Sequence, residues 1–318
     1  MKSLLITRAM PQRVLDAAQD RFDVTVYPGT RAMTLDEASA ALAKYDAVLP
    51  TLGDSFGAAA FGNSDLRCRM LANFGVGYNH IDTVAAKAAG VMVSNTPGAV
   101  TDATADIALL LMLGTARRAG EGERMLRAGR WDGWTPTQLL GLHMSGRTVG
   151  VVGMGRIGKA IARRCHYGFG MDVVFYNRSP VADPGMPAAQ LDTLAEVGAR
   201  ADFVVVAVPG GAGTRHLIGQ GALAAMQSHA ILVNIARGDV VDEAALIEAL
   251  QAGQIGGAGL DVYENEPDVP KALKAMENVT LLPHLGTAAL DVREGMGMMA
   301  LDNLIAFDEG RAPPNLLT

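Results

Sequence analysis

The sequence predicts an α/β protein made of two doubly wound, Rossmann-like domains. Its 318 residues are enough for two domains of ordinary size. Short apolar runs alternate with stretches of helical spacing along most of the chain, which is typical of parallel sheets covered by helices. The composition agrees, because 37 glycines and 49% hydrophobic residues suit many tight turns between buried strands and helices.

The stretch from residue 147 to residue 179 has a nucleotide-binding pattern. A strand-like run at 149–152 leads into a Gly-x-Gly-x-x-Gly turn and then into helical spacing, and a second strand follows at 172–176. This is the order of a dinucleotide-binding fold. The first glycine permits a tight turn, the second lets the backbone approach a pyrophosphate, and the third lets helix and strand pack closely. The helix N-terminus favours the phosphates. The expected contacts in this turn are Gly153, Gly155, Arg156, Ile157 and Gly158.

The first hundred residues repeat the alternation of strands and helices but contain no nucleotide fingerprint. The expected strands are 4–7, 24–27, 47–52, 70–74 and 91–94, and the expected helices are 11–18, 35–42 and 81–89. This pattern predicts a flavodoxin-like domain that binds the substrate rather than the cofactor. The Asn-Thr-Pro-Gly turn at 95–98 is its expected boundary.

Residues 99–288 are expected to form the dinucleotide-binding domain. Its first helix, 105–118, is apolar on nearly every face and would be capped by Thr101 or Asp102. An irregular excursion at 127–145 contains Trp131 and Trp134. Further strands are expected at 204–208, 231–235, 259–262 and 279–282. The last helix, 288–307, is predicted to return to the first domain, which then comprises residues 1–98 and 289–318.

Composition argues against several classes of partner and compartment. A net charge of −6 without a basic face argues against nucleic acid. Cys68 and Cys165 are too few for a disulfide framework, which favours a reducing cytoplasm. The longest apolar run, 107–113, is much shorter than a membrane span, and the N-terminal run is too short for a signal peptide. We therefore expect a soluble cytoplasmic protein without a membrane partner.

The end of the second strand of the dinucleotide pattern indicates which dinucleotide is preferred. An NAD-selective site usually has Asp or Glu there, hydrogen-bonded to the ribose hydroxyls. This sequence has the neutral Asn177, followed by Arg178 and Ser179, which can pair with and donate to a 2′-phosphate. A solvated turn is the alternative, since Asn-Arg-Ser is ordinary turn chemistry. The pattern favours NADP(H), with NAD(H) possible.

Two charged side chains follow buried strands of the second domain. Arg237 comes after the strand at 231–235, where a permanently charged guanidinium is costly unless it meets an anion such as the carboxylate of a 2-oxoacid. A structural ion pair is the alternative. His284 ends another strand, at the edge of the sheet where ligands bind, and its imidazolium can give a proton to a carbonyl oxygen. A structural histidine is the alternative there. Glu264 and Glu266 are both candidates for the carboxylate that stabilises this imidazolium.

Six motifs follow one another between residues 73 and 288. They are NFGVGYNHID at 73–82, NTPGAVTDATADIALLL at 95–111, the glycine turn, NIARGDVVDEAAL at 234–246, GLDVYENEP at 259–267 and LLPHLGTA at 281–288. Together they resemble the D-isomer-specific 2-hydroxyacid dehydrogenases, and the Asn-Arg-Ser turn is most similar to that of the glyoxylate and hydroxypyruvate reductases. The resemblance implies NADPH-dependent reduction of a small 2-oxoacid to a 2-hydroxyacid. The substrate would bind in a cleft between the two domains of one chain, and two chains would form a homodimer.

The resemblance also implies roles for individual residues. The catalytic residues would be Arg237, Glu266 as the partner of the histidine, and His284 as proton donor, and Glu264 would then be a solvated loop acid. The substrate carboxylate would be bound by Arg237 and by the backbone N–H groups of Val76 and Gly77. The further cofactor contacts would be Thr104, Val208, Pro209, Thr214, Ile235, Ala236, Asp261 and Gly286. No metal is implied, because the remaining histidines show no ligand spacing.

Two alternatives stay open at this point. A reductase of the same family that acts on a larger 2-ketoacid would need a roomier first domain. A non-catalytic NAD(P)H-binding regulatory protein would bind partners without turning over a substrate. Residues 52–56, Tyr78 and residues 131–140 are expected to set the size of side chain that the site accepts.

Overall fold

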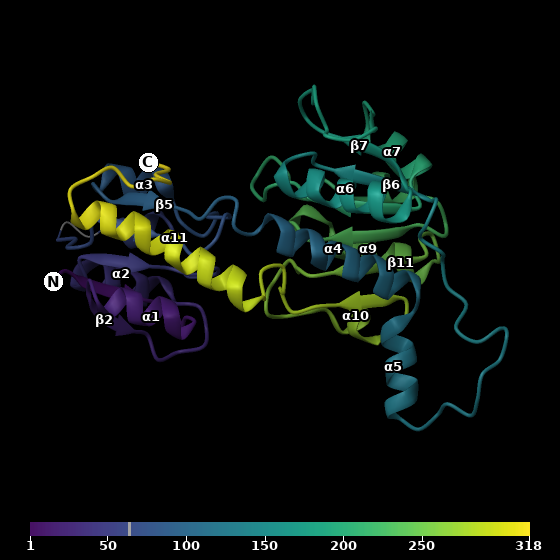
Figure 1. Ribbon diagram of the computed structural model, residues 1–318, viewed down its shortest axis with the longest axis horizontal. Helices are drawn as coiled ribbons and strands as arrows, with labels where there is room; N and C mark the ends of the chain where they lie inside the picture. The colour runs from purple at the N-terminus through teal and green to yellow at the C-terminus, as the bar shows by residue number, and fades with distance from the viewer. Residues whose placement is uncertain (63–64) are drawn as a thin grey trace. The chain divides into compact units, whose positions relative to one another are not determined.

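The computed structural model describes residues 1–62 and 65–318. The chain forms two compact units, Met1–Val100 with Thr287–Thr318 and Thr101–Gly286. The domain limits expected from the sequence, at 98/99 and 288/289, lie two residues from these. Figure 1 shows how the chain leaves the first unit, completes the second, and returns to the first in its last helix.

The first unit is built on a five-stranded parallel sheet of order β2-β1-β3-β4-β5, which is the flavodoxin-like order. Its strands are β1 (Ser3–Ile6), β2 (Asp23–Val26), β3 (Ala47–Leu49), β4 (Met70–Ala72) and β5 (Met92–Ser94). Its helices are α1 (Gln12–Gln19), α2 (Leu35–Lys44), the 3-10 turn η1 (Ala58–Phe61), α3 (Thr83–Ala88) and α11 (Leu290–Asp308).

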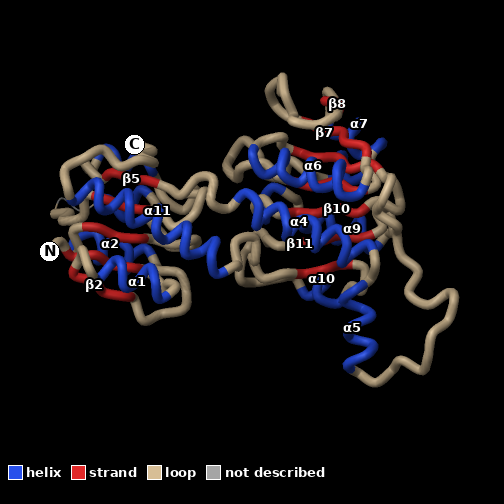
Figure 2. Tube along the Cα trace, viewed as in Figure 1, coloured by secondary structure: helices blue, strands red, loops and turns tan. Residues whose placement is uncertain are grey.

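Alternating side chains of these strands form two cores, one on each face of the sheet. Leu5, Val48 and Leu71 face α2 and α3, whereas their neighbours Leu4 and Leu49 face α1 and α11. Successive strand residues point to opposite faces, so a sheet that is covered on both sides reads as a continuous apolar run. Figure 2 shows this layered arrangement of strands and helices.

The second unit has a seven-stranded parallel sheet of order β12-β11-β10-β9-β6-β7-β8. Its strands are β6 (Thr148–Val152), β7 (Asp172–Tyr176), β8 (Ala189–Gln190), β9 (Phe203–Val206), β10 (Ile231–Asn234), β11 (Gly257–Leu260) and β12 (Val279–Leu281). Helices α4 (Thr101–Ala116) and α6 (Arg156–Phe169) cover one face of the sheet. The other face is covered by α7 (Leu194–Arg200), α8 (Gln220–Ala224), α9 (Glu243–Gln251) and α10 (Lys271–Ala275).

The α/β class with two parallel sheets is confirmed, but several elements differ from the prediction. Helix α4 begins at Thr101, so Thr101 and Asp102 lie inside the helix rather than capping it. Helix α5 (Ala119–Arg127) was not expected, because its polar sequence lacks a broad apolar stripe. Strand β8 was not expected either, because its two residues are exposed and pair only with β7.

A long irregular segment, 128–147, separates α5 from β6 and forms the wide excursion seen in Figure 1. Trp131 is 50% exposed and Trp134 is 78% exposed. Within the described residues, no helix combines the length and the apolar character needed to cross a membrane.

Candidate active site

The functional residues of the second unit lie beyond the carboxyl ends of its strands. Each expected site residue named here lies within three residues of a strand end. They are Gly153 after β6, Asn177 after β7, Val208 after β9, Ile235 and Arg237 after β10, Asp261 after β11 and His284 after β12. The strands are parallel to their neighbours, so these ends share one edge of the sheet. Ligands of doubly wound proteins bind at this edge.

The glycine turn between β6 and α6 has the geometry of a phosphate-binding turn. Gly153 has a φ of +99°, a conformation that side chains disfavour. A Cβ at Gly158 would lie 2.0 Å from the carbonyl oxygen of Gly153, so only glycine lets α6 approach the turn. Gly155 directly precedes α6, and a Cβ there would meet no atom within 4 Å. No side chain at position 155 therefore blocks the first N–H groups of α6, at Arg156 and Ile157. A pyrophosphate needs this access to reach them.

The end of β7 is shaped by Asn177 and by a residue that sequence reasoning missed. Asn177 Oδ1 accepts a hydrogen bond from Met154 N at 3.2 Å, which ties the glycine turn to this strand. Gln190 Nε2, from β8, donates to the carbonyl oxygens of Asn177 (3.3 Å) and Ser179 (3.2 Å). Arg178 is exposed and forms no ion pair with the residues that the structure describes. Its charge is therefore available to a ligand.

The segments after β9 and β10 contain the other expected cofactor residues. Thr214 Oγ1 donates to the carbonyl oxygen of Pro209 at 2.8 Å and thereby closes the turn after β9, while Val208 is half-buried. Ile235 and Ala236 are buried at the end of β10. Contact between these residues and a cofactor stays a prediction.

Arg237 is placed in a position that suits an anion. Gly210 makes room for it, because a Cβ at Gly210 would lie 2.6 Å from Arg237 Cγ. Burial lowers the pKa of Arg237 from its usual value, while the carboxylates of Glu266 and Asp239 act in the opposite direction. The guanidinium donates to the carbonyl oxygen of Ala236 at 2.7 Å and has no carboxylate within 4.0 Å among the described residues. A guanidinium remains charged in proteins, so this one lacks a close counter-ion.

His284 and Glu266 form a hydrogen-bonded pair. His284 Nδ1 lies 2.8 Å from Glu266 Oε2, and Glu266 Oε1 accepts from Tyr263 N at 3.1 Å. Burial alone would raise the pKa of Glu266, but the hydrogen bond and charge of His284, the N–H of Tyr263 and the charge of Arg237 together hold that pKa below its usual value. His284 has a φ of +53°, a strained conformation of the kind found at functional sites. The pair thus joins the loop of Glu266 to the segment that follows β12.

Asp261 and Thr104 hold the segment that follows His284. The buried carboxylate of Asp261 accepts hydrogen bonds from Leu285 N (2.6 Å) and Gly286 N (2.8 Å), and Thr104 Oγ1 donates to the carbonyl oxygen of Gly286 at 3.2 Å. Burial raises the pKa of Asp261, and the two backbone donors and His284 oppose this effect. The observed role of both side chains is to fix this loop, and their contact with nicotinamide stays a prediction.

Glu264 is not the solvated loop acid that was expected. Its side chain is 19% exposed, Oε1 lies 2.7 Å from His216 Nε2, and the same oxygen accepts from Glu243 N at 3.3 Å. Glu264 N in turn donates to Glu243 Oε1 at 3.0 Å. These bonds attach the loop of Glu266 to the start of α9. Sequence reasoning missed them because the partners lie 21 and 48 residues away along the chain.

His216, Asp242 and Glu264 place three possible metal-ligating groups within 4.8 Å of one another. However, the two ring nitrogens of His216 face different carboxylates, with Nδ1 3.7 Å from Asp242 Oδ2 and Nε2 2.7 Å from Glu264 Oε1. One metal ion binds only one of these nitrogens, so the arrangement suits hydrogen bonding to both acids better than chelation.

A cavity of about 570 Å³ lies away from these residues, at the amino ends of β10, β11 and β12. Ile231, Gly256 and Asn278 line it together with Leu140 of the excursion. Because it lies at the opposite edge of the sheet from His284 and Arg237, it is separate from the candidate active site.

In the first unit, Val76 and Gly77 lie in the turn after β4. Gly75 begins this turn with a φ of +150°. Val76 and Tyr78 are 36% and 39% exposed, so the outer side of the turn is open to a ligand.

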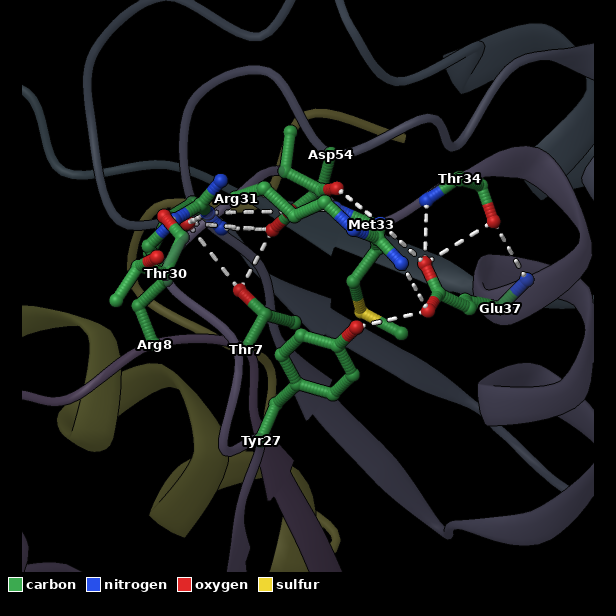
Figure 3. Close-up of polar contacts among 11 residues, drawn as sticks. Thr7, Arg8, Tyr27, Thr30, Arg31, Met33, Thr34, Glu37 and Asp54 are labelled. Atoms are coloured by element: carbon green, nitrogen blue, oxygen red, sulfur yellow. Dashed lines mark hydrogen bonds and ion pairs between the residues drawn. The ribbon is translucent and has the colours of Figure 1, made fainter.

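A buried carboxylate anchors the loop beside this turn (Figure 3). Asp54 accepts hydrogen bonds from Thr51 N (2.8 Å), Met33 N (2.9 Å) and Thr7 Oγ1 (2.6 Å), and it pairs with the Arg8 guanidinium at 3.1 Å. Thr51 pairs with Phe74 just before the Val76–Gly77 turn. Sequence reasoning had placed residues 52–56 near the substrate but had not found that Asp54 fixes them.

Known proteins share the sequence and the fold of this chain. Residues 109–286 match the family model described as D-isomer specific 2-hydroxyacid dehydrogenase, NAD binding domain. The glyoxylate reductase of Thermococcus gammatolerans is 42% identical over 99% of this chain and 95% of its own length.

Two solved structures share the fold over the whole chain. The TT0316 protein of Thermus thermophilus is 40% identical, with a TM-score of 0.92 over 99% of this chain and all of its own. The NADPH-dependent glyoxylate/hydroxypyruvate reductase of Sinorhizobium meliloti, in complex with NADP and malonate, is 36% identical, with a TM-score of 0.88 over all of this chain and 97% of its own. The chain therefore belongs to the D-isomer-specific 2-hydroxyacid dehydrogenase family, and its second unit contains the nicotinamide-dinucleotide-binding domain of that family.

Proposed function

We propose that this protein is an NADPH-dependent reductase of small 2-oxoacids, with glyoxylate and hydroxypyruvate as its preferred substrates. The observation that carries the proposal is the 2.8 Å contact between His284 and Glu266, within electrostatic reach of an Arg237 that has no close counter-ion. Glyoxylate reductases at about 40% identity support the substrate class.

In the proposed reaction, His284 gives a proton from Nε2 to the carbonyl oxygen of the substrate as a hydride reaches the carbonyl carbon. Bound NADPH supplies that hydride. Glu266 engages Nδ1, so Nε2 is left for the substrate, and no described residue forms a hydrogen bond or ion pair with this nitrogen. The Glu266 carboxylate also stabilises the imidazolium that is present before the proton leaves.

The substrate carboxylate is assigned to Arg237 and to the backbone N–H groups of Val76 and Gly77. A guanidinium presents a planar fork that can bind a carboxylate and polarise the adjacent carbonyl. The turn of Val76 and Gly77 adds donors from the first unit.

The cofactor is assigned to the glycine turn and to the end of β7. Gly153, Gly155, Gly158 and the start of α6 would bind the pyrophosphate. Arg178, exposed and unpaired within the described chain, would bind the 2′-phosphate, and the neutral Asn177 would not repel it. The Sinorhizobium meliloti relative binds NADP. The further contacts proposed on the resemblance are Thr104, Ser179, Val208, Pro209, Thr214, Ile235, Ala236, Asp261 and Gly286.

The test is oxidation of NADPH and of NADH at pH 7 with 2-oxoacids of increasing size, for wild type, Arg178→Asp and His284→Ala. We expect kcat/KM to be highest for the smallest acids and at least about tenfold higher with NADPH. Loss of a charge-assisted bond of about 1.5–3 kcal/mol should remove most of that preference in Arg178→Asp. Loss of the proton donor should lower kcat by about 10²–10⁴-fold in His284→Ala.

A different experimental result would contradict each part of the proposal. Equal efficiency with NADH would remove the cofactor preference. Faster turnover of acids with large side chains would favour the reductase of a larger 2-ketoacid. NADPH binding without turnover of any acid would favour the regulatory protein.

We further propose that the protein is a homodimer formed through the second unit. The support is the excursion at 128–147, where Trp131, Trp134 and Leu140 expose apolar surface on a segment without regular structure. Exposed aromatic residues of this kind are enriched at protein interfaces.

A further inference from the structure

Three consecutive carbonyl groups in the turn after β4 are engaged by the body of the first unit. Asn73 Nδ2 donates to the carbonyl oxygens of Gly75 and Gly77, both at 3.0 Å. Asn95 Nδ2 donates to the carbonyl oxygen of Val76 at 2.9 Å. The Gly75 oxygen also accepts from the backbone N–H of Thr96 at 3.1 Å. All three carbonyl groups of the turn are therefore directed at internal donors.

Peptide planarity then fixes the direction of three N–H groups. In a trans peptide the C=O of one residue and the N–H of the next point in opposite directions. The N–H groups of Val76, Gly77 and Tyr78 share their peptide groups with the three anchored carbonyls, so they point away from the two asparagines. No residue in the described ranges accepts a hydrogen bond from these three N–H groups. The exposed side of the turn thus presents three free donors, which suit an anion.

The orientation of the Asn73 amide supports this role. The side chain is fully buried, and its Oδ1 has no hydrogen-bond partner among the described residues. Rotation of the amide by half a turn would place Oδ1 about 3.0 Å from two carbonyl oxygens, where it would be repelled. The buried amide therefore leaves its own oxygen unpaired, which is costly, while it holds the two carbonyls of the turn.

We propose that Asn73 and Asn95 are positioning residues for a three-donor carboxylate site formed by the N–H groups of Val76, Gly77 and Tyr78. The inference rests on the proposed function, since the ligand is the carboxylate of a small 2-oxoacid. It adds a third donor, at Tyr78, and two side chains that do not themselves touch the substrate. Their function is to keep carbonyl oxygens, which repel a carboxylate, turned away from it.

The experiment compares Asn73→Ala, Asn73→Asp and Asn95→Ala with wild type and with Asp46→Asn as the control. Asp46 belongs to the same unit but precedes β3, at the opposite edge of the sheet, where it accepts from Ser3 N at 2.7 Å and pairs with Arg67 at 2.8 Å. Asp46→Asn thus loses polar contacts of the first unit without touching the turn. Asn73→Ala removes both donors, and Asn73→Asp keeps the shape but replaces donors by acceptors.

The probe is oxalate, a dicarboxylate that cannot be reduced in this way, titrated calorimetrically into the NADPH-loaded protein. We expect the oxalate Kd to rise at least about tenfold in Asn73→Ala, further in Asn73→Asp, and about threefold or more in Asn95→Ala. The NADPH Kd should stay within about twofold, and the KM for glyoxylate should rise more than kcat falls. Backbone ¹⁵N relaxation should show residues 75–78 becoming mobile in Asn73→Ala but not in Asp46→Asn.

The outcomes separate this inference from the proposed function. If wild type reduces glyoxylate while Asn73→Ala matches Asp46→Asn in oxalate Kd and in the relaxation of residues 75–78, the positioning role is overturned. If wild type reduces no 2-oxoacid, the proposed function fails, and the oxalate titration and relaxation data still decide the inference. If wild type does not bind oxalate, the three-donor site is overturned as well.

Discussion

Glu264 and Glu266 lie two positions apart in one short loop, and each is bound to a different histidine. Glu266 Oε2 is 2.8 Å from His284 Nδ1, and Glu264 Oε1 is 2.7 Å from His216 Nε2. Because Glu264 is also bonded to Glu243, it is not available to His284. The loop thus provides the candidate proton donor with a single, defined carboxylate.

The lowered pKa of Glu266 predicts a pH-dependent contribution to stability. A carboxyl with a depressed pKa in the folded state stabilises the fold fully above its unfolded pKa, about 4.3, and loses that contribution as pH falls through the folded value. Glu266→Gln imitates the protonated acid. We expect this variant to be less stable than wild type at pH 6, by on the order of 1 kcal/mol, and the difference to shrink below pH 4. Urea unfolding at pH 6, 5, 4 and 3 measures it, and a difference that stays constant to pH 3 would contradict the prediction.

At this scale, residue type makes His284 and Arg237 candidates, because few positions after a buried strand tolerate such a side chain, and the resemblance selects Glu266 over Glu264 as the partner of the histidine. The hydrogen-bond partners are harder to predict. Glu264 and Asp54 look like ordinary loop acids in the sequence, and only the fold shows that His216 and the backbone N–H of Met33 lie against them. Long-range partners leave no local pattern, so sequence reasoning missed both anchors.

At the scale of elements, the crossing of α1 and α11 depends on one glycine. A Cβ at Gly297 would lie 2.5 Å from Val14 Cγ2, so any side chain there forces the two helices apart. Gly295, on the same helix, is exposed, and a Cβ there would meet no atom within 4 Å.

Alanine substitutions at these two glycines of the same helix are expected to change the stability of the protein in opposite directions. Gly297→Ala should lower the free energy of unfolding by about 1–3 kcal/mol through overpacking. Gly295→Ala should raise it by up to about 1 kcal/mol, because alanine favours the helix over glycine. Thermal or urea unfolding of the two variants decides the matter. Equal effects at the two positions would show that the helix crossing is not tight.

Element types were predictable because both sheets are covered on two faces, which turns their strands into apolar runs. Several expected strands ran too far toward their carboxyl ends, for instance to 52 where β3 ends at Leu49, and to 208 where β9 ends at Val206. Most of the extra residues are also apolar, but they lie beyond the last residues of β3 and β9. Apolar character alone therefore does not show where a strand ends.

At the scale of the whole molecule, the exposed excursion at 128–147 makes the proposed dimer testable. Wild type should sediment with twice the 33.2 kDa mass of one chain. Trp134→Ala should raise the dimer dissociation constant at least about tenfold, since buried tryptophans dominate many interfaces. Tyr167→Ala, which removes an exposed aromatic ring from α6 outside the excursion, is the control and should leave the dimer intact. A wild type that remains monomeric at micromolar concentration would refute the dimer.

The return of the chain to its first unit also has a consequence for biosynthesis. Leu301 and Leu304 of α11 complete the core on the face of the sheet that α1 also covers, where α11 packs against β4, yet the ribosome must first make all of Thr101–Gly286. At about 5–20 residues per second, that interval lasts about 10–40 seconds. For that time α1 alone covers this face of the nascent first unit, and Met70 and Ala72 of β4 lack the cover that α11 provides. The unit that leaves the ribosome first is thus the last to be finished, and this face is where a chaperone would bind the growing chain.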